Sequence, residues 1–172
     1  MPPAAQSGSV QQLTPTKKLI DAGGGTYERF VEKIPERMSD SPVVMRVIFA
    51  AHRLQPKDKW NPTMNFCVAA KRIDSTHCLQ AYATKDGTRF IANTHWKASE
   101  SAELIATDLP FDLAPLEDYY LDIVLSKDRL VMKIQDRQIM DVPTQAAPDE
   151  YWSSCLSVVC SVDILYPYVE PE

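Results

Sequence analysis

The feature that most constrains the fold is a series of short β-rich runs that follow one another along the chain. They cover residues 43–49, 64–70, 77–83, 88–93, 102–107, 119–126, 129–134, 137–141 and 155–166. Turn-forming pairs such as Asp86-Gly87, Lys127-Asp128 and Gln135-Asp136 stand between them and favour hairpins. The sequence therefore predicts an all-β protein, an antiparallel β-sandwich in which sequential strands pair as a meander.

Side-chain alternation supports this prediction in the second half of the chain. Leu121, Ile123 and Leu125 share one parity in the run 119–126, as expected of a strand that buries one face. The only helical turn that the sequence predicts is 149–152, which follows a proline and begins with an aspartate able to cap it. No other stretch has an amphipathic pattern of helix length.

The N-terminal segment has a different composition. Residues 1–25 include Pro2-Pro3, scattered Gln and Ser, and three consecutive glycines at 23–25. Such a segment buries too little apolar surface to offset its ordering entropy, so we expect a flexible arm. Residues 26–172 are expected to form one β-sandwich domain with a core that begins near Tyr27 and Phe30, because 172 residues suit a single domain.

Charge and hydropathy narrow the classes of partner. The net charge is −5, and the 18 Lys and Arg residues are scattered rather than gathered in a stripe, which disfavours nucleic acid. No apolar run reaches the length of a membrane span, and no charged start followed by an apolar stretch marks a leader. These features predict a cytoplasmic or nuclear protein.

The cysteines and histidines show no metal-ligand spacing. No CxxC pair is present, and each cysteine lies in an apolar or alternating run, so we expect buried free thiols in preference to two disulfides or a zinc site. The histidines share no close spacing with the cysteines or with one another. No metal or other cofactor is therefore expected. The residues concerned are Cys67, Cys78, Cys155, Cys160, His52, His77 and His95.

Catalytic signatures are also missing from the sequence. It contains no GxSxG elbow, no HExxH and no phosphate-binding glycine loop. His77 and Cys78 are adjacent in an expected strand and so point to opposite faces, which prevents a direct imidazole–thiolate pair. Glu100 and Glu103 form a pair of acids, but such acids on an open sheet are more often solvated surface charge. We expect a protein that is not an enzyme.

Between Cys78 and Val142 the order of features resembles a galectin carbohydrate-recognition domain. The resemblance rests on residues 90–93, on Leu109-Pro110-Phe111 and on the two alternating strands that follow. The runs 30–35 and 156–164 look like the opening and closing strands of that family. The resemblance spans about residues 27–169 and implies a jelly-roll sandwich of the galectin/concanavalin-like type that binds carbohydrate.

The sugar-binding positions match the family only in part. Galectins bind galactosides with His, Asn and Arg at alternate positions of one strand, and here that strand carries Gln80, Tyr82 and Thr84. Asn93 falls on the family's Asn and Glu103 on its Glu, so the resemblance implies a site with these five residues. Any one of them could equally be an ordinary polar residue of an exposed sheet face.

Two tryptophans are further candidates for contact with a ligand or a partner. The position of the family's Trp falls on Glu100, but Trp96 stands nearby in a polar stretch and is a candidate for stacking on a sugar ring, or for packing at the rim of the sandwich. Trp60 is expected in a loop, either as an anchor for a partner or as a lid on the sandwich end.

Three interpretations follow from this sequence. The first is a non-catalytic galectin-like module that binds glycans with altered or weak galactoside specificity. The second is a protein-interaction or scaffolding module that has lost sugar binding, and for it we expect a homodimer formed through the apolar 155–168 run at a sheet edge. The third is a β-sandwich without galectin ancestry, because the same pattern recurs in unrelated proteins.

Overall fold

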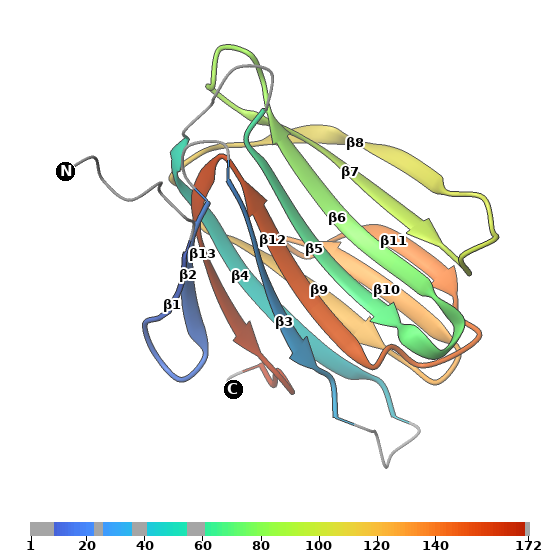
Figure 1. Cartoon of the computed structure of the whole chain (residues 1–172). Helices are drawn as coiled ribbons and strands as arrows, with labels where there is room; N and C mark the ends of the chain where they lie inside the picture. Colours follow the sequence, from blue (N-terminus) through green and yellow to red (C-terminus); the bar gives the residue numbers. More distant parts are fainter. Residues whose placement is uncertain (1–8, 23–25, 36–40, 55–60, 171–172) are drawn as a thin grey trace.

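Two antiparallel sheets packed face to face form the protein, which confirms the predicted β-sandwich (Figure 1). The structure, a computed structural model, describes residues 9–22, 26–35, 41–54 and 61–170. The one helical element in these ranges is the 3-10 turn η1 (Lys71–Ile73). In this part of the chain no helix is long and apolar enough to cross a membrane.

The two sheets contain seven and six strands. In spatial order the larger sheet contains β1 (Ser9–Gln12), β2 (Lys17–Asp21), β13 (Val158–Leu165), β4 (Val43–Leu54), β9 (Tyr119–Leu125), β10 (Arg129–Ile134) and β11 (Arg137–Pro143). The smaller contains β3 (Tyr27–Lys33), β12 (Glu150–Leu156), β5 (Thr63–Ala70), β6 (Ser75–Ala83), β7 (Phe90–Lys97) and β8 (Ile105–Leu113). The runs β5–β8 and β9–β11 are the predicted meanders, whereas β12 and β13 return to pair with strands from early in the chain.

The core fills the space between the sheets. Every second residue of each strand points into it. Leu121, Ile123 and Leu125 are among its fully buried members, as their alternation predicts. Phe49 of β4 meets Phe66 of β5 with ring centroids 4.3 Å apart, which joins the two sheets near the middle of the molecule.

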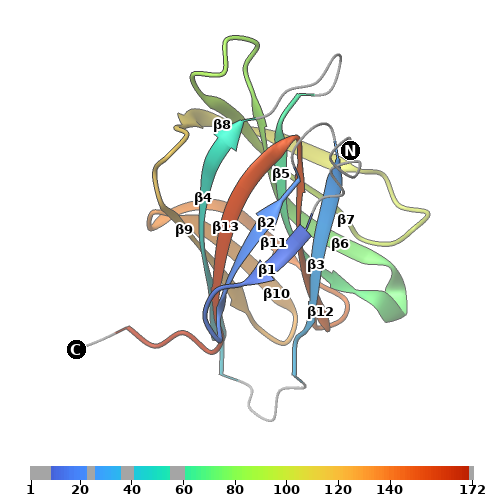
Figure 2. The ribbon, with the colours of Figure 1, turned by 60° about the vertical axis from the view of Figure 1, so that its left-hand side comes forward.

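The prediction of a flexible arm over residues 1–25 is wrong for the part of that segment that the structure describes. Residues 9–12 and 17–21 form β1 and β2, and β2 pairs with β13 (Figure 2). Ile20 is completely buried in the core. Composition alone suggested that the entropic cost of ordering this segment would be too large. Burial of this side chain and a ladder of backbone hydrogen bonds offset that cost.

The predicted helical turn at 149–152 and the single strand at 155–166 are also corrected. Residues 150–156 are strand β12 of the six-stranded sheet, and β13 begins at Val158 in the other sheet. The chain changes sheets at Ser157, which has a positive φ of 55°. Similarly, the strand expected at 102–107 begins at Ile105 and continues to Leu113.

The expectation of free thiols is wrong, although the cysteines are buried as predicted. Cys67 and Cys78 are direct neighbours across β5 and β6 and form one disulfide. Cys155 and Cys160 form the other, on either side of the turn between β12 and β13. Disulfides are typical of proteins in oxidising compartments, so they count against the predicted cytoplasmic or nuclear location, which stays a prediction.

The expectation that the 155–168 run forms a free sheet edge for a homodimer is also wrong. Strand β13, which contains most of the apolar 155–168 run, lies between β2 and β4 and so has no free edge. Among the strands that the structure describes, β1 and β11 form the edges of the larger sheet, and β3 and β8 those of the smaller one. Homodimer formation stays a prediction without this support.

A buried ion pair ties the segment after β13 to the outer surface of the larger sheet. Arg46 donates from Nε and Nη2 to the two carboxylate oxygens of Asp122, each at 2.7 Å. Its guanidinium lies over the rings of Tyr120 and Tyr168, at 4.2 and 3.9 Å from their centroids. The same group donates to the Tyr168 hydroxyl at 2.9 Å, so the Arg46 side chain links strands β4 and β9 to the C-terminal segment.

Candidate functional site

A row of polar side chains crosses the outer face of the six-stranded sheet. The strand register places its members directly opposite one another on successive strands, and their parity is opposite to that of core residues such as Leu79 and Ala81. We call this set the polar row. Its members, from β3 to β8, are Arg29, Ser154, Asn65, Gln80, Asn93 and Asp108.

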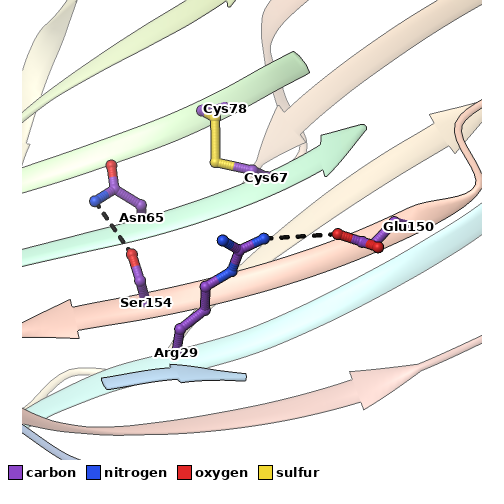
Figure 3. Close-up of a disulfide and its surroundings, with 6 residues drawn as sticks. All are labelled: Arg29, Asn65, Cys67, Cys78, Glu150 and Ser154. Atoms are coloured by element: carbon purple, nitrogen blue, oxygen red, sulfur yellow. Dashed lines mark hydrogen bonds and ion pairs between the residues drawn. A yellow bond between two sulfur atoms is a disulfide. The ribbon is translucent and has the colours of Figure 1, made fainter. Parts of the chain in front are cut away.

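Two hydrogen bonds link neighbours within the polar row. The amide of Asn65 donates to the Ser154 hydroxyl at 3.4 Å, and the amide of Asn93 donates to Gln80 Oε1 at 3.3 Å. Figure 3 shows Asn65 and Ser154 pointing toward each other above the ribbon. Each amide has more than one donor or acceptor position, so these bonds orient the side chains while leaving positions for a ligand.

A groove of about 410 Å³ lies on this face over β3, β12, β5 and β6. Its walls include two tyrosines from opposite sides, Tyr27 of β3 and Tyr82 of β6. Leu156 and Thr63 lie between them in the register, and Asn65 and Gln80 of the polar row line the groove two residues further along β5 and β6. The remaining lining residue is Asn61. No lining residue carries a charge, so the groove offers amides, hydroxyls and aromatic surface to a ligand.

Charged side chains lie to one side of the groove. Arg29 stacks over the ring of Trp152 at 4.6 Å and approaches Glu150, with Nη2 3.6 Å from the carboxylate (Figure 3). Lys71 contacts the other oxygen of Glu150 at 2.8 Å. Glu150 thus faces two cations, and the charge of Arg29, at the β3 end of the polar row, is partly neutralised.

The disulfide Cys67–Cys78 joins β5 and β6 on the same face, two residues along each strand from Asn65 and Gln80. The register places Cys67 beside Trp152 and Cys78 beside His95, and both cysteines are buried despite facing outward. Figure 3 shows the disulfide that joins them. Burial lowers the pKa of His95 below its ordinary value. The sheet beneath Asn65 and Gln80 is therefore covalently cross-linked.

Three of the predicted site residues come together on this surface. Gln80 and Asn93 are paired across β6 and β7, and Tyr82 lies on the same face of β6 in the wall of the groove. Thr84 follows the end of β6 and belongs to the turn: its hydroxyl donates to Asp86, and this bond is the largest cause of a pKa of about 2 for Asp86. This hydrogen bond gives the Thr84 hydroxyl a role in the turn, so a ligand is not needed to explain a polar side chain at this position.

Trp96 lies on the opposite face of the sheet from Asn93. An odd spacing of three residues along β7 turns its side chain toward the interior, where its ring stacks on His77 with centroids 5.6 Å apart and planes within 6°. Trp96 therefore does not line the groove, and its position against the core agrees with the second of its two predicted roles, packing in the sandwich, rather than with stacking on a sugar beside Asn93. Trp60 lies outside the described residues.

Glu103 is likewise apart from the polar row. It is exposed in the segment between β7 and β8, as is Glu100, and neither belongs to a strand. The register places Asp108, not Glu103, opposite Asn93. The expectation that Glu103 shares a sheet face with Asn93 is wrong, because β8 begins later than the sequence pattern indicated.

Sequence reasoning missed Asn65, Thr63 and Tyr27 as candidates. Asn65 stands alone in an apolar run between Met64 and Phe66, and a polar residue at that position of a strand is a signal for an outward-facing amide. The contribution of β3 and β12 could not be found in this way, because it depends on pairing between segments distant in the sequence.

Metal ligands do not gather in the described structure. Within residues 9–22, 26–35, 41–54 and 61–170, no group of three or more His, Cys, Asp or Glu side chains is placed to hold a metal ion. The arrangement on the outer face is one of hydrogen-bonding and aromatic groups.

No protein-family model matches the chain, and no curated protein matches it by sequence. Solved structures do share its fold. The carbohydrate recognition domain of Emp46p in its metal-free form has a TM-score of 0.62 at 9% identity, covering 93% of this chain and 85% of that one. The carbohydrate-binding module CBM66 from Bacillus subtilis has a TM-score of 0.54 at 9% identity, with 94% and 92% covered.

A galectin has the same fold at a similar level of likeness. The tetrameric galectin from the ball sponge Cinachyrella sp. has a TM-score of 0.53 at 9% identity, covering 80% of this chain and 99% of that one. An alginate lyase from Zobellia galactanivorans is also similar, with a TM-score of 0.50 at 9% identity and coverage of 74% and 63%. These likenesses show a lectin-like β-sandwich, a fold that includes both binding modules and enzymes.

Proposed function

We propose that this chain is a non-catalytic carbohydrate-binding module that holds a neutral glycan in the groove between Tyr27 and Tyr82. The observation that carries the proposal is the polar row, which brings Asn65 and Gln80 into an uncharged groove of about 410 Å³. Carbohydrate recognition domains and binding modules among the structures of similar fold support it.

The chemistry of the groove suits sugar hydroxyls. Each amide presents a donor and an acceptor, which match the paired donor and acceptor character of adjacent hydroxyls. The tyrosine rings offer apolar faces with a hydroxyl at the tip, so they pack against the C–H face of a pyranose while staying hydrated at the edge. The register places Tyr27 and Tyr82 three strand spacings apart, or about 14 Å.

The lining also predicts which glycans are excluded. Carboxylated or sulfated sugars would lose hydration without meeting a cation in the groove, which is costly. The galactoside-binding pattern of His, Asn and Arg is replaced by Gln80 and Tyr82 on β6 and by Thr84 just after it, and Thr84 is engaged in the turn. We therefore expect weak or absent lactose binding and selectivity for another neutral sugar.

The test is a glycan array on the purified protein, followed by calorimetric titration of the best neutral ligand. Asn65→Ala and Gln80→Ala should each weaken binding about two- to tenfold, the effect of losing one hydrogen bond to a neutral partner. Glu103→Ala is the matched control: it removes an exposed polar side chain away from the groove and should leave affinity unchanged.

A second titration separates the groove from the rest of the polar row. Asn93 orients Gln80 but does not line the groove, so Asn93→Ala should have a smaller effect than Gln80→Ala. A blank array from folded protein, or binding that Glu103→Ala abolishes and Gln80→Ala spares, would overturn the proposal. The first of these results would favour the protein-interaction alternative, and light scattering would then test the predicted homodimer.

A further inference from the structure

A second cavity lies between the two sheets, on the opposite side of β6 and β7 from the groove. Its volume is about 300 Å³. His77 of β6 and Trp96 of β7 form one side, and Pro143, at the end of β11, and the adjoining Thr144 form the other. Figure 1 shows β11 behind β6 and β7, where the edge of the larger sheet approaches the smaller one.

Three buried polar atoms in this cavity have no hydrogen-bond partner among the residues that the structure describes. They are Nδ1 and Nε2 of His77 and Oγ1 of Thr144. The His77 side chain is almost completely enclosed, with the residue 2% exposed. Buried polar groups in native proteins are nearly always paired, so the two ring nitrogens and the hydroxyl need a partner beyond the described residues, either water or a bound molecule.

The rest of the lining determines the charge of that occupant. Trp96, Ala98 and Pro143 give an apolar wall, Ser75 and Gln145 add neutral polar groups, and no lining residue is an Asp, Glu, Lys or Arg. Burial lowers the pKa of His77 to about 4, so at neutral pH its imidazole is uncharged and offers one donor and one acceptor. An ion would lose its hydration here without a counter-charge, which is expensive, whereas a neutral molecule would not.

Size and shape point to a ring. An engineered apolar cavity of about 150 Å³ is large enough to bind benzene, and this cavity is larger. His77 and Trp96 line the cavity and stack on each other with nearly parallel planes, so aromatic side chains form this part of its wall. A molecule of one or two rings with a single hydrogen-bonding group would contact that surface and reach the polar atoms of His77 or Thr144.

We propose that the cavity bounded by His77, Trp96 and Thr144 is a second binding site, which takes a small neutral ring molecule bearing a hydrogen-bond donor or acceptor. It is separate from the glycan groove, because the two lie on opposite faces of the six-stranded sheet. The proposal does not depend on carbohydrate binding.

The direct test uses phenol and indole as probes, with benzoate and benzylamine as charged relatives. Each is titrated into the folded protein while the imidazole resonances of His77 and the indole resonance of Trp96 are followed by NMR. Phenol or indole should produce saturable shifts at both side chains. The charged probes should produce none at the same concentrations.

Two variants test whether the probes bind in this cavity. Thr144→Val keeps the shape but removes the hydroxyl, and should weaken a probe bonded to it about two- to tenfold. Ala98→Phe places a ring into the partly exposed margin of the cavity and should abolish binding by filling it. Gln80→Ala lies on the other face of β6 and is the matched control, expected to leave probe affinity unchanged. Thermal melting of each variant confirms that it is folded.

Two results would overturn the proposal. One is the absence of saturable shifts with either neutral probe in folded protein, which would mean that water fills the cavity and satisfies His77. The other is probe binding that Ala98→Phe and Thr144→Val both leave intact, which would place the probe elsewhere. Neither result bears on the glycan array, and a blank array would not alter the probe titration.

Discussion

The burial of His77 makes the stability of the protein depend on pH in a defined window. The side chain is enclosed between the sheets, and desolvation lowers its pKa from 6.5 to about 4. In the unfolded chain the same imidazole is hydrated and titrates near its ordinary value. Between these two pKa values, the unfolded state binds a proton that the folded state does not.

The sign and size of the effect follow from linkage. Because the unfolded state binds more protons in this window, the free energy of unfolding falls as the pH falls from 6.5 toward 4, and it is fully retained above 6.5. Each pH unit of difference between the two pKa values corresponds to about 1.4 kcal/mol, so the full loss is about 3 kcal/mol. That is a large share of the stability of an ordinary domain.

Chemical denaturation at a series of pH values from about 7 to about 4.5 would measure this loss. His77→Phe removes the titrating group and keeps a ring against Trp96, so its stability should fall less over the same range. His95 also has a lowered pKa and contributes in the same direction. His95→Gln is therefore the matched control, and it should retain most of the wild-type slope.

The change of unfolding free energy with pH in wild type and in His77→Phe decides whether His77 is the group responsible. If wild type and His77→Phe lose stability in parallel on acidification, the imidazole of His77 is not desolvated in the folded state, and the reasoning fails. A wild-type protein that becomes more stable between pH 6.5 and 4 would refute the sign as well. Should His77→Phe not fold, His77→Gln tests the same point, because its amide does not titrate.

Other predictions concern features outside this cavity. Reduction of the disulfides should lower the melting temperature. Mass spectrometry after alkylation of the denatured, unreduced protein should find Cys67 and Cys78 unmodified, and alkylation of either would contradict the pairing. Arg46→Met should cost about 3 kcal/mol in denaturant unfolding, since it leaves the buried carboxylate of Asp122 unpaired, and an unchanged midpoint would refute that role. Gly87→Ala should cost about 1 kcal/mol, because Gly87 has a positive φ of 70°, and a gain in stability would contradict it.

Local pattern was sufficient to predict most strands but not where the chain changes sheet. Alternation and turn pairs determine the meanders β5–β8 and β9–β11, whose neighbours are close in sequence. The run 155–166 contains no Gly or Pro, so nothing in its composition indicates a turn at Ser157. The same limit applies to β2, whose ladder depends on β13 more than one hundred residues away, and which composition therefore assigned to a flexible arm.

The candidate site was predictable to the extent that it depends on strand parity. Gln80 and Tyr82 share a face because they are two residues apart, and Asn93 joins them through the register of one hairpin. Parity also shows that Trp96, three residues from Asn93, points the other way. The contributions of β3 and β12 could not be predicted, because they come from pairing between the ends of the chain.

The strand order has a consequence for how the protein folds as it is made. β3 and β5 flank β12, and β2 and β4 flank β13, so strands near the start of the chain reach their neighbours only after residues 150–165 have left the ribosome. Until then β2, β3, β4 and β5 present unpaired edges. Such non-local pairing slows folding and exposes strands to association, so the nascent chain should depend on chaperone protection more than its size alone suggests.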